Sequence, residues 1–362
     1  MSSRLQLKAC VVLVRPFRFY GNTITAADNE YQKLDNLQGL DAAQRADWEQ
    51  KASRKALAEH DDVVRALISR GVAVVRLDWA LESALTEQQR NIPDSIFPNN
   101  SFSIHYVESS PVPVVFLWPM SAGRRNEIPT SLLTLFFALQ EKGSLMVVDF
   151  RSYEANGQAL EGTGALVFSP DGRTVYMSSS VRTSEPVLDL ACNILGIPKE
   201  NRFVFTTGGS TGKPIYHTNV MMWTGEGICA VYRSGMRFAS AAEAARFDAH
   251  LVATYKTILN LSEAEINGFA GNCLEVCTTE GNRLLCMSQA AYKALSEPHK
   301  QAIDAMYKAP HSKVVMNIGQ IEHLGGGSVR CLLAAPIVAR RDADLTPLVS
   351  SLQSLSVAKA RL

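Results

Sequence analysis

One pattern recurs along this chain and restricts the folds open to it: a segment with helical periodicity, a short turn, then an apolar strand. The pattern occurs five times, and repeats longer than about 20 residues indicate a repeated architecture. The helix-like segments and the strands that follow them are 52–70 with 72–77, 130–141 with 145–149, 184–195 with 203–206, 241–259 with 268–276, and 288–308 with 313–318. The repeat predicts a five-fold ring of mixed α/β units, and an ordinary mixed α/β domain stays open as the alternative.

Two further segments refine this organisation. Short apolar runs at 166–168 and 174–177 flank Pro-Asp-Gly (170–172), which predicts a β-hairpin. Residues 26–60 are polar and helix-favouring, and they resemble an insertion into the first unit. No low-complexity linker divides the sequence, so we expect one domain over residues 1–362 with a helical insertion at about 26–60.

Composition narrows the classes of partner and compartment. Among 362 residues, 46% are hydrophobic and 20% charged, and the net charge is +1, so no basic excess exists to bind nucleic acid. The apolar runs are too short for a membrane span, and the first residues lack the apolar core of a signal peptide. Seven cysteines without a CxxC pair fit reduced thiols in the cytoplasm.

A cysteine behind a glycine run, Gly-Gly-Gly-Ser-Val-Arg-Cys (325–331), is the first candidate for chemistry. The ordinary interpretation is a core cysteine in a strand at 329–337, because cysteine is among the most buried residue types. A strand needs no preceding glycine run, whereas a backbone that approaches a ligand closely does. We therefore favour Cys331 as a nucleophile over a packing residue.

A histidine and a carboxylate are the expected helpers. His217 ends an apparent strand beside Thr-Asn (218–219), where imidazole suits general acid–base work near neutral pH. His323 is the rival, although it lies before the glycine run. Glu161 in Leu-Glu-Gly-Thr-Gly (160–164) is either a surface turn or a carboxylate that orients the histidine.

Two other loops were weighed for ligand binding. Asp94 and Asn100 belong to the loop Asp-Ser-Ile-Phe-Pro-Asn-Asn (94–100), which its prolines and asparagines would form in any case. The stretch 207–214 resembles a phosphate loop but has Thr207 at the first glycine position and Pro214 after the lysine. No cysteine or histidine cluster has zinc spacing, so we predict neither a nucleotide nor a metal cofactor.

These motifs, in this order, resemble the guanidine-modifying enzymes of the pentein superfamily. The resemblance covers about residues 8 to 338 and rests on 97–100, 160–164, 216–222 and 325–331. It is closest to the citrulline-utilising hydrolases and the amidinotransferase-like and dimethylarginine dimethylaminohydrolase-like proteins. The family fold is a five-bladed α/β propeller, which agrees with the five units of the repeat.

The resemblance implies a role for each matching position. Cys331 matches the nucleophile, His217 the general acid/base, and Glu161 the carboxylate that orients the histidine and holds substrate nitrogens. Asp94, Asn100 and Asn219 match the substrate-binding positions, and Arg182 and Arg124 match arginines that pair with a substrate carboxylate. The implied partner is a small amino-acid substrate, and a homo-oligomer stays open.

The sequence departs from arginine-directed relatives at two positions. Asn100 and Asn219 stand where many of those relatives have aspartate. Carboxylates grip a cationic guanidinium through charge-assisted hydrogen bonds, whereas an amide offers a neutral acceptor and two donors. The amides therefore favour a neutral ureido group, and we expect citrulline rather than arginine.

The expected chemistry is attack of the Cys331 thiolate on the guanidino or ureido carbon, with a protonated His217 donating to the departing nitrogen. Water would then hydrolyse the thio-intermediate. An amine acceptor would make the protein an amidinotransferase, and arginine deiminase or dimethylargininase activity is a further alternative. A non-catalytic pentein would need none of these residues, and a cysteine peptidase would leave Arg182 without a role.

Overall fold

Each sheet of the computed structural model contains two parallel strands joined through at least one helix. The structure describes residues 10–35, 37–79, 85–210, 212, 214–338 and 346–355, to which all structural statements refer. The pairs are β1 (Cys10–Arg15) and β2 (Ala73–Asp78) around α2 (Ala42–Ile68); β4 (Val114–Leu117) and β5 (Met146–Asp149) around α4 (Thr130–Glu141); β7 (Val175–Ser178) and β8 (Arg202–Thr207) around α6 (Glu185–Leu195); β10 (Ile228–Val231) and β12 (Thr257–Asn260) around α8 (Ala241–Thr254); and β14 (Arg283–Ser288) and β15 (Lys313–Met316) around α10 (Gln289–Ala294) and α11 (Glu297–Met306).

An antiparallel strand precedes four of these pairs. These strands are β3 (Phe102–Tyr106), β6 (Leu166–Phe168), β9 (Met222–Gly225) and β13 (Leu274–Cys277). In the first sheet, Val12 of β1 instead pairs with Ala334 through backbone hydrogen bonds of 2.8 and 3.0 Å. Two-residue strands β11 (Met236–Arg237) and β16 (Ile337–Val338) extend the edges of two sheets. The chain thus returns near its end to the strand with which the described structure begins.

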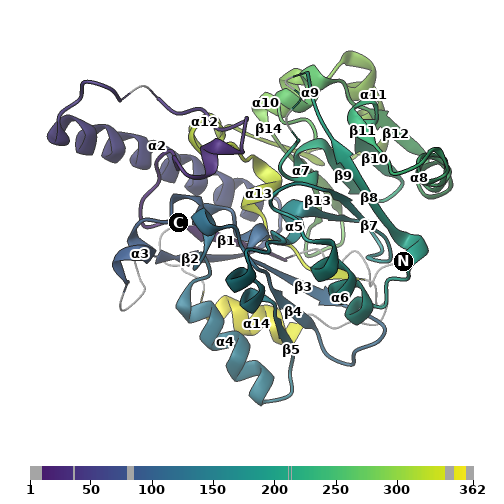
Figure 1. Cartoon of the computed structure of the whole chain (residues 1–362), viewed down its shortest axis with the longest axis horizontal. Coiled ribbons are helices and arrows are strands. Elements are labelled where there is room, and N and C mark those ends of the chain that lie inside the picture. The colour runs from purple at the N-terminus through teal and green to yellow at the C-terminus, as the bar shows by residue number, and fades with distance from the viewer. Residues whose placement is uncertain are drawn as a thin grey trace.

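The helices divide into a peripheral set and a central set. Figure 1 shows α2, α4, α8 and α11 around the outside, with α5, α7 and α13 in the middle. The central helices are short: α5 (Gly162–Ala165), α7 (Thr218–Met221), α12 (Gly319–Gly325) and α13 (Val329–Leu332). The others are α3 (Glu87–Arg90), α9 (Glu263–Asn267) and α14 (Thr346–Ser354). The motifs at 160–164, 216–222 and 325–331 therefore lie on the short central helices or next to them, whereas the loop 94–100 contributes the 3₁₀ helices η3 (Pro93–Ile96) and η4 (Pro98–Asn100).

Helix α6 shows how the peripheral helices are stabilised. Its apolar side chains recur at helical spacing and are buried with those of the neighbouring sheet: Val187, Leu188, Ala191, Cys192 and Leu195. Burying each large aliphatic side chain contributes roughly 1.5–3 kcal/mol. Gly196 ends the helix at a φ of 69°, a conformation that favours glycine.

Four of the five helix-then-strand units expected from the sequence are present, as is the β6–β7 hairpin. In the fourth unit the strand that follows α8 is β12, whereas of the expected strand 268–276 only residues 274–276 belong to a strand, β13. Helix α4 begins and ends at the expected residues. The expected helix 241–259 was too long, because the chain leaves α8 after Thr254 and the β-branched Thr257 and Ile258 pair with β10. The expected strand 329–337 was wrong, since Cys331 lies in α13.

The helical part of the insertion expected at 26–60 belongs to α2, the helix of the first unit. Helix α2 begins at a capping box between Asp41 and Gln44 and continues without interruption to Ile68, the helix of the first unit. The preceding residues run toward the centre of the molecule, where Thr25 and Asn29 are buried. In the described part of the chain no helix is long and apolar enough to span a membrane. The seven cysteines are buried and unbridged.

Candidate active site

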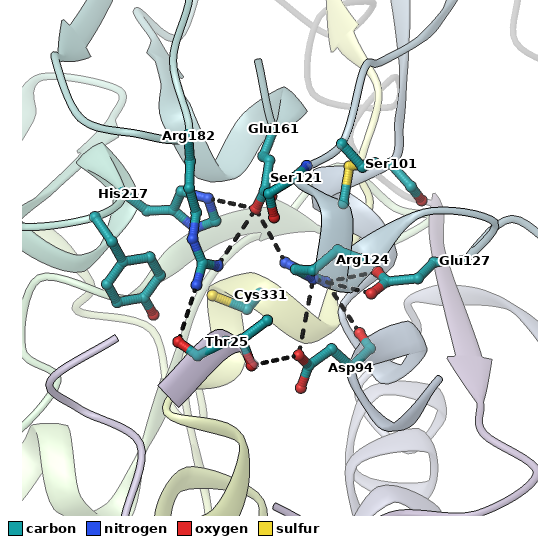
Figure 2. Close-up of polar contacts among 12 residues, drawn as sticks. Thr25, Asp94, Ser101, Ser121, Arg124, Glu127, Glu161, Arg182, His217 and Cys331 are labelled. Carbon is teal, nitrogen blue, oxygen red and sulfur yellow. Dashed lines mark hydrogen bonds and ion pairs between the residues drawn. The ribbon is translucent and has the colours of Figure 1, made fainter. Parts of the chain in front are cut away.

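A single buried carboxylate, that of Glu161, holds the candidate site together (Figure 2). Its Oε2 accepts hydrogen bonds from His217 Nε2 at 2.9 Å, Arg124 Nη1 at 3.3 Å and Arg182 Nη1 at 3.5 Å. Its Oε1 accepts from the backbone N of Ser121 at 3.1 Å and from its Oγ at 2.6 Å. Burial would raise the pKa of Glu161, but the two guanidinium groups hold it well below its usual value.

The glycines beside Glu161 allow three segments to meet. Gly162 has a φ of 39°, and a Cβ there would lie 2.7 Å from the carbonyl oxygens of Asn99 and Asn100. A Cβ on Gly164 would lie 2.0 Å from Asn100 Oδ1 and 2.8 Å from His217 Nδ1. The Glu-Gly-Thr-Gly motif is therefore required by close packing, and it brings the histidine beside the Asn100 loop.

His217 occupies the residue position just before α7, and its side chain is buried. Burial lowers its pKa to about 4, and the charges of Arg182 and Arg124 act in the same direction, against the bond to Glu161. The imidazole is therefore neutral near pH 7, with Nε2–H donating to Glu161 and Nδ1 left as the basic nitrogen. This differs from the protonated histidine expected from the sequence, because the sequence does not show that the imidazole is buried, nor that the two arginines lie close to it.

The Cys331 sulfur lies between two amides. Asn219 Nδ2 approaches Sγ at 3.4 Å and Asn272 Nδ2 at 3.3 Å, and all three side chains are buried. Asn272 also donates to the backbone oxygen of Asn219 and accepts from the backbone N of Arg330. Sequence reasoning missed Asn272, which stands in no recognised motif.

The expected substrate loop supplies acceptors with no partner among the described residues. Asp94 Oδ2 accepts from Asn22 Nδ2 and Thr25 Oγ1, both at 2.9 Å, but Asp94 Oδ1 and Asn100 Oδ1 are buried without a partner. Asn219 Oδ1 is likewise buried without a hydrogen-bond partner among the described residues. Burial raises the pKa of Asp94, although Arg124 opposes this. Unpaired buried acceptors are costly, so a ligand with N–H donors would complete this wall.

Both predicted carboxylate-binding arginines are present and buried, and each already holds a protein carboxylate. Arg124 donates Nε and Nη2 to Glu127, at 2.9 and 2.6 Å. Arg182 donates Nε to Asp28 at 2.9 Å and Nη2 to its second oxygen, and its guanidinium lies 4.8 Å from the centre of the Tyr216 ring. Sequence reasoning missed both acidic partners, although Arg124 and Glu127 are only three residues apart.

The functional side chains surround a cavity of about 10 Å³, roughly the space of one water molecule. Its walls are Asn29, Asp94, Phe97, Asn100, Arg124, Arg182, Tyr216, His217, Gly325, Gly327 and Cys331. A Cβ on Gly325 would lie 2.7 Å from the Phe97 ring, so the glycine run makes room for that ring. Glu161 and Asn219, behind the wall, contact His217 and Cys331 respectively.

The structure thus brings together all eight side chains singled out from the sequence. One implied role does not fit the contacts: both oxygens of Glu161 are engaged by protein donors, so holding substrate nitrogens would need those bonds to break. The rival His323 lies elsewhere, exposed and bonded to Asp35. Of the stretch that resembles a phosphate loop, Thr211 and Lys213 lie outside the described residues.

A buried cysteine, histidine and carboxylate within a repeated α/β scaffold fit the class of guanidine-modifying enzymes. The family model of eukaryotic N,N-dimethylarginine dimethylhydrolase matches residues 15–338. The chain belongs to this family. Among curated protein sequences, none matches the chain.

Solved structures share the fold at low sequence identity. The apo arginine dihydrolase ArgZ, from the ornithine–ammonia cycle in cyanobacteria, has a TM-score of 0.58 at 15% identity and covers 90% of this chain. This chain spans only 40% of the length of that protein. The isolated N-terminal domain of ArgZ, bound to its substrate, has a TM-score of 0.60 at 15% identity, and the match covers 91% of this chain and 99% of that domain. DDAH from Pseudomonas aeruginosa, complexed with citrulline, has a TM-score of 0.50 at 14% identity, covering 90% of this chain and 98% of its own.

Proposed function

We propose that this protein is a cysteine-dependent hydrolase that acts on the guanidino or ureido carbon of an arginine- or citrulline-like amino acid. The observation that carries the proposal is the convergence of Cys331, His217 and the unpaired oxygens of Asp94 and Asn100 on one cavity. Membership of the dimethylarginine dimethylhydrolase family supports the reaction class. The neighbours ArgZ, an arginine dihydrolase, and DDAH bound to citrulline support the class of ligand.

The proposed mechanism starts from the neutral histidine. His217 accepts the proton of the Cys331 thiol, and the thiolate attacks the central carbon to form a sulfur–carbon bond. The carbon–nitrogen bond then breaks as the His217 imidazolium returns the proton to the departing nitrogen. Water, deprotonated by the neutral His217, attacks the thio-intermediate, and the sulfur leaves with the proton. Glu161 orients the histidine throughout, and the Asn219 and Asn272 amides hold the sulfur.

Citrulline, with ornithine as product, is the substrate we favour. Asp94 supplies one carboxylate oxygen to the cavity wall, while Asn100 supplies a neutral amide oxygen. Fewer negative charges weaken the grip on a guanidinium and suit a ureido group, whose N–H groups need acceptors. Dimethylarginine, the substrate in the family's name, and arginine are the alternatives. An amidinotransferase reaction would require an amine to reach the thio-intermediate instead of water.

At the level of the fold, we propose a five-bladed α/β propeller forming one domain. Support comes from the five sheets with a common strand–helix–strand unit and from the pairing of Val12 with Ala334, which brings the two ends of the repeat together. Of the insertion expected at about 26–60, residues 26–35 and 37–41 then remain, because the rest belongs to α2, the helix of the first unit. The buried, unbridged cysteines support a reducing compartment, the cytosol.

The test is to incubate the protein separately with citrulline, arginine and dimethylarginine, and to measure ornithine, ammonia and citrulline. Ornithine formed from citrulline, and absent with Cys331→Ala, is the expected result. Citrulline formed from arginine or dimethylarginine would refute the substrate inference and retain the nucleophile. Equal activity of the Cys331→Ala variant would refute the mechanism.

A further inference from the structure

The two arginines of the site are built alike on their inner side. Each donates Nη1 to the same oxygen of Glu161, and each points Nε and Nη2 at a second carboxylate. That second carboxylate is Glu127 for Arg124 and Asp28 for Arg182. A fork of two parallel N–H groups is the arrangement that binds a carboxylate most selectively. Each arginine offers one such binding position, which we call its seat, and a protein carboxylate occupies it.

The two occupants differ in exposure and in origin. The Glu127 side chain is 1% exposed and stands three residues from Arg124. The Asp28 side chain is 32% exposed, although the Arg182 side chain that it contacts is only 2% exposed. Asp28 belongs to the segment that precedes α2, 154 residues from Arg182. Removing Glu127 from its arginine would open the buried interior, whereas Asp28 can turn into solvent, where a carboxylate is well hydrated.

The guanidinium of Arg182 is held in place by contacts that do not involve Asp28. Its Nη1 donates to Glu161, its Nη2 also donates to the backbone oxygen of Thr25 at 3.3 Å, and the Tyr216 ring lies against it at 4.8 Å. If the Asp28 carboxylate left, the fork would remain oriented toward its vacated seat. The present cavity of about 10 Å³ holds no amino acid, so substrate entry requires some such displacement.

We propose that Asp28 occupies the seat on Arg182 that the substrate carboxylate takes, and that it acts as an internal competitor which sets the affinity for carboxylate-bearing substrates. This inference rests on the proposed function. Because one carboxylate replaces another, the exchange keeps the buried guanidinium paired. Ligands that lack the carboxylate have no group to compete for this seat, so Asp28 affects the two kinds of ligand differently.

The test compares Asp28→Asn with the wild-type protein on citrulline and on its decarboxylated analogue. Asparagine keeps the shape but loses the charge that holds the seat. We expect the KM for citrulline to fall roughly five-fold, as for a partly exposed charge pair, with kcat unchanged. The constant for the decarboxylated analogue, a KM or an inhibition constant, should stay the same. Glu30→Gln removes a charge from the same segment outside the contacts of Arg182 and should change neither constant.

An unchanged KM for citrulline would overturn the inference, and so would three other results. An equal fall for both ligands would mean that Asp28 restricts access in general. A rise in the KM for citrulline would mean that Asp28 binds the substrate, for instance its amino group. The same fall in the KM for citrulline in Glu30→Gln would mean that the effect comes from the net charge of the segment and not from the contact between Asp28 and Arg182. If the wild-type protein turned over neither citrulline, arginine nor dimethylarginine, the proposed function would fail, and the inference with it.

Discussion

Arg124 and Arg182 share one carboxylate and each binds a second one, but the two second carboxylates differ in exposure and in origin. The second carboxylate of Arg124 is that of Glu127, which is buried and lies three residues away in the sequence. The second carboxylate of Arg182 is that of Asp28, which comes from a distant segment of the chain and is about one-third exposed. Both guanidinium groups carry a full charge in a nearly dry environment, and burial of such a charge is tolerated only when it is paired.

Residue type and burial therefore do not by themselves determine the function of a charged side chain. The outer partner decides whether an arginine is part of the scaffold or is available to a ligand. By this criterion Arg124 holds Glu161 and the Asp94 loop in place, since its Nη2 also donates to the backbone oxygen of Asp94 at 3.1 Å. Arg182 is the arginine whose outer carboxylate can be exchanged.

The largest effect should follow from removing the carboxylate that both arginines share. In Glu161→Gln, His217 loses the acceptor that orients it, and two guanidinium groups lose a charged partner. We expect kcat/KM to fall by about 10²–10⁴-fold, the usual contribution of an aligned acid–base group. Steady-state kinetics would measure it. Glu154→Gln, which alters a neighbouring glutamate that accepts from the backbone of Met120, is the matched control and should stay within a few-fold of wild type.

The second prediction tests the two outer partners against each other. Glu127→Gln breaks a buried pair and should lower the free energy of unfolding by about 3–5 kcal/mol. Asp28→Asn breaks a partly exposed pair and should lower it by about 1 kcal/mol or less. Chemical denaturation of both variants would measure the difference. Equal losses would remove the distinction between a scaffold arginine and an exchangeable one.

The third prediction concerns the histidine between the arginines. The unfolded chain binds a proton on His217 near pH 6.5, whereas in the native protein its pKa is lowered to about 4 by burial and by the two arginines. Between these values the unfolded state binds more protons, so stability falls as the pH falls. Relative to His217→Asn, the wild-type protein should lose about 1.4 kcal/mol per pH unit in this window. A difference independent of pH across this window would mean that folding does not lower the pKa of His217.

The smallest effect on reactivity should appear at the Cys331 sulfur, whose neighbours are the two amides of Asn219 and Asn272. Asn272→Ala removes one of two N–H donors to Cys331, and alkylation of Cys331 at neutral pH should slow roughly five-fold, the value of about one hydrogen bond. Mass spectrometry of the alkylated peptide would give the rate. Asn219→Ala should have a similar effect. An unchanged rate in both variants would mean that the amides pack against the sulfur without influencing it.

The sequence predicted those parts of the molecule that depend on local patterns. Helix α4 was placed correctly, because its apolar spacing is regular and Gly143 follows it. The motif at 160–164 was identified from the sequence as a surface turn or a presented carboxylate, and the structure shows why glycines stand at 162 and 164: they are in close contact with Asn100 and His217. The site residues could be found because short motifs, each modest, occur in a fixed order.

The parts that were missed depend on contacts between distant segments. Asp28 and Asn272 stand in unremarkable sequence, and only the fold carries them to Arg182 and Cys331. The protonation of His217 depends first on its burial and then on two arginines that lie 35 and 93 residues before it, and the sequence shows neither the burial nor the closeness of those arginines. The strand assigned around Cys331 was wrong because a buried apolar run has no visible periodicity when it turns into a one-turn helix.

The most direct test of the account is to identify the atom that becomes covalently attached to the substrate. The wild-type protein would be mixed with citrulline labelled at the ureido carbon, quenched in acid within a turnover, digested, and examined by mass spectrometry. The account predicts the labelled carbon on the peptide that contains Cys331, with no label in Cys331→Ala. Product formation with no label on Cys331, or with label on another residue, would contradict it.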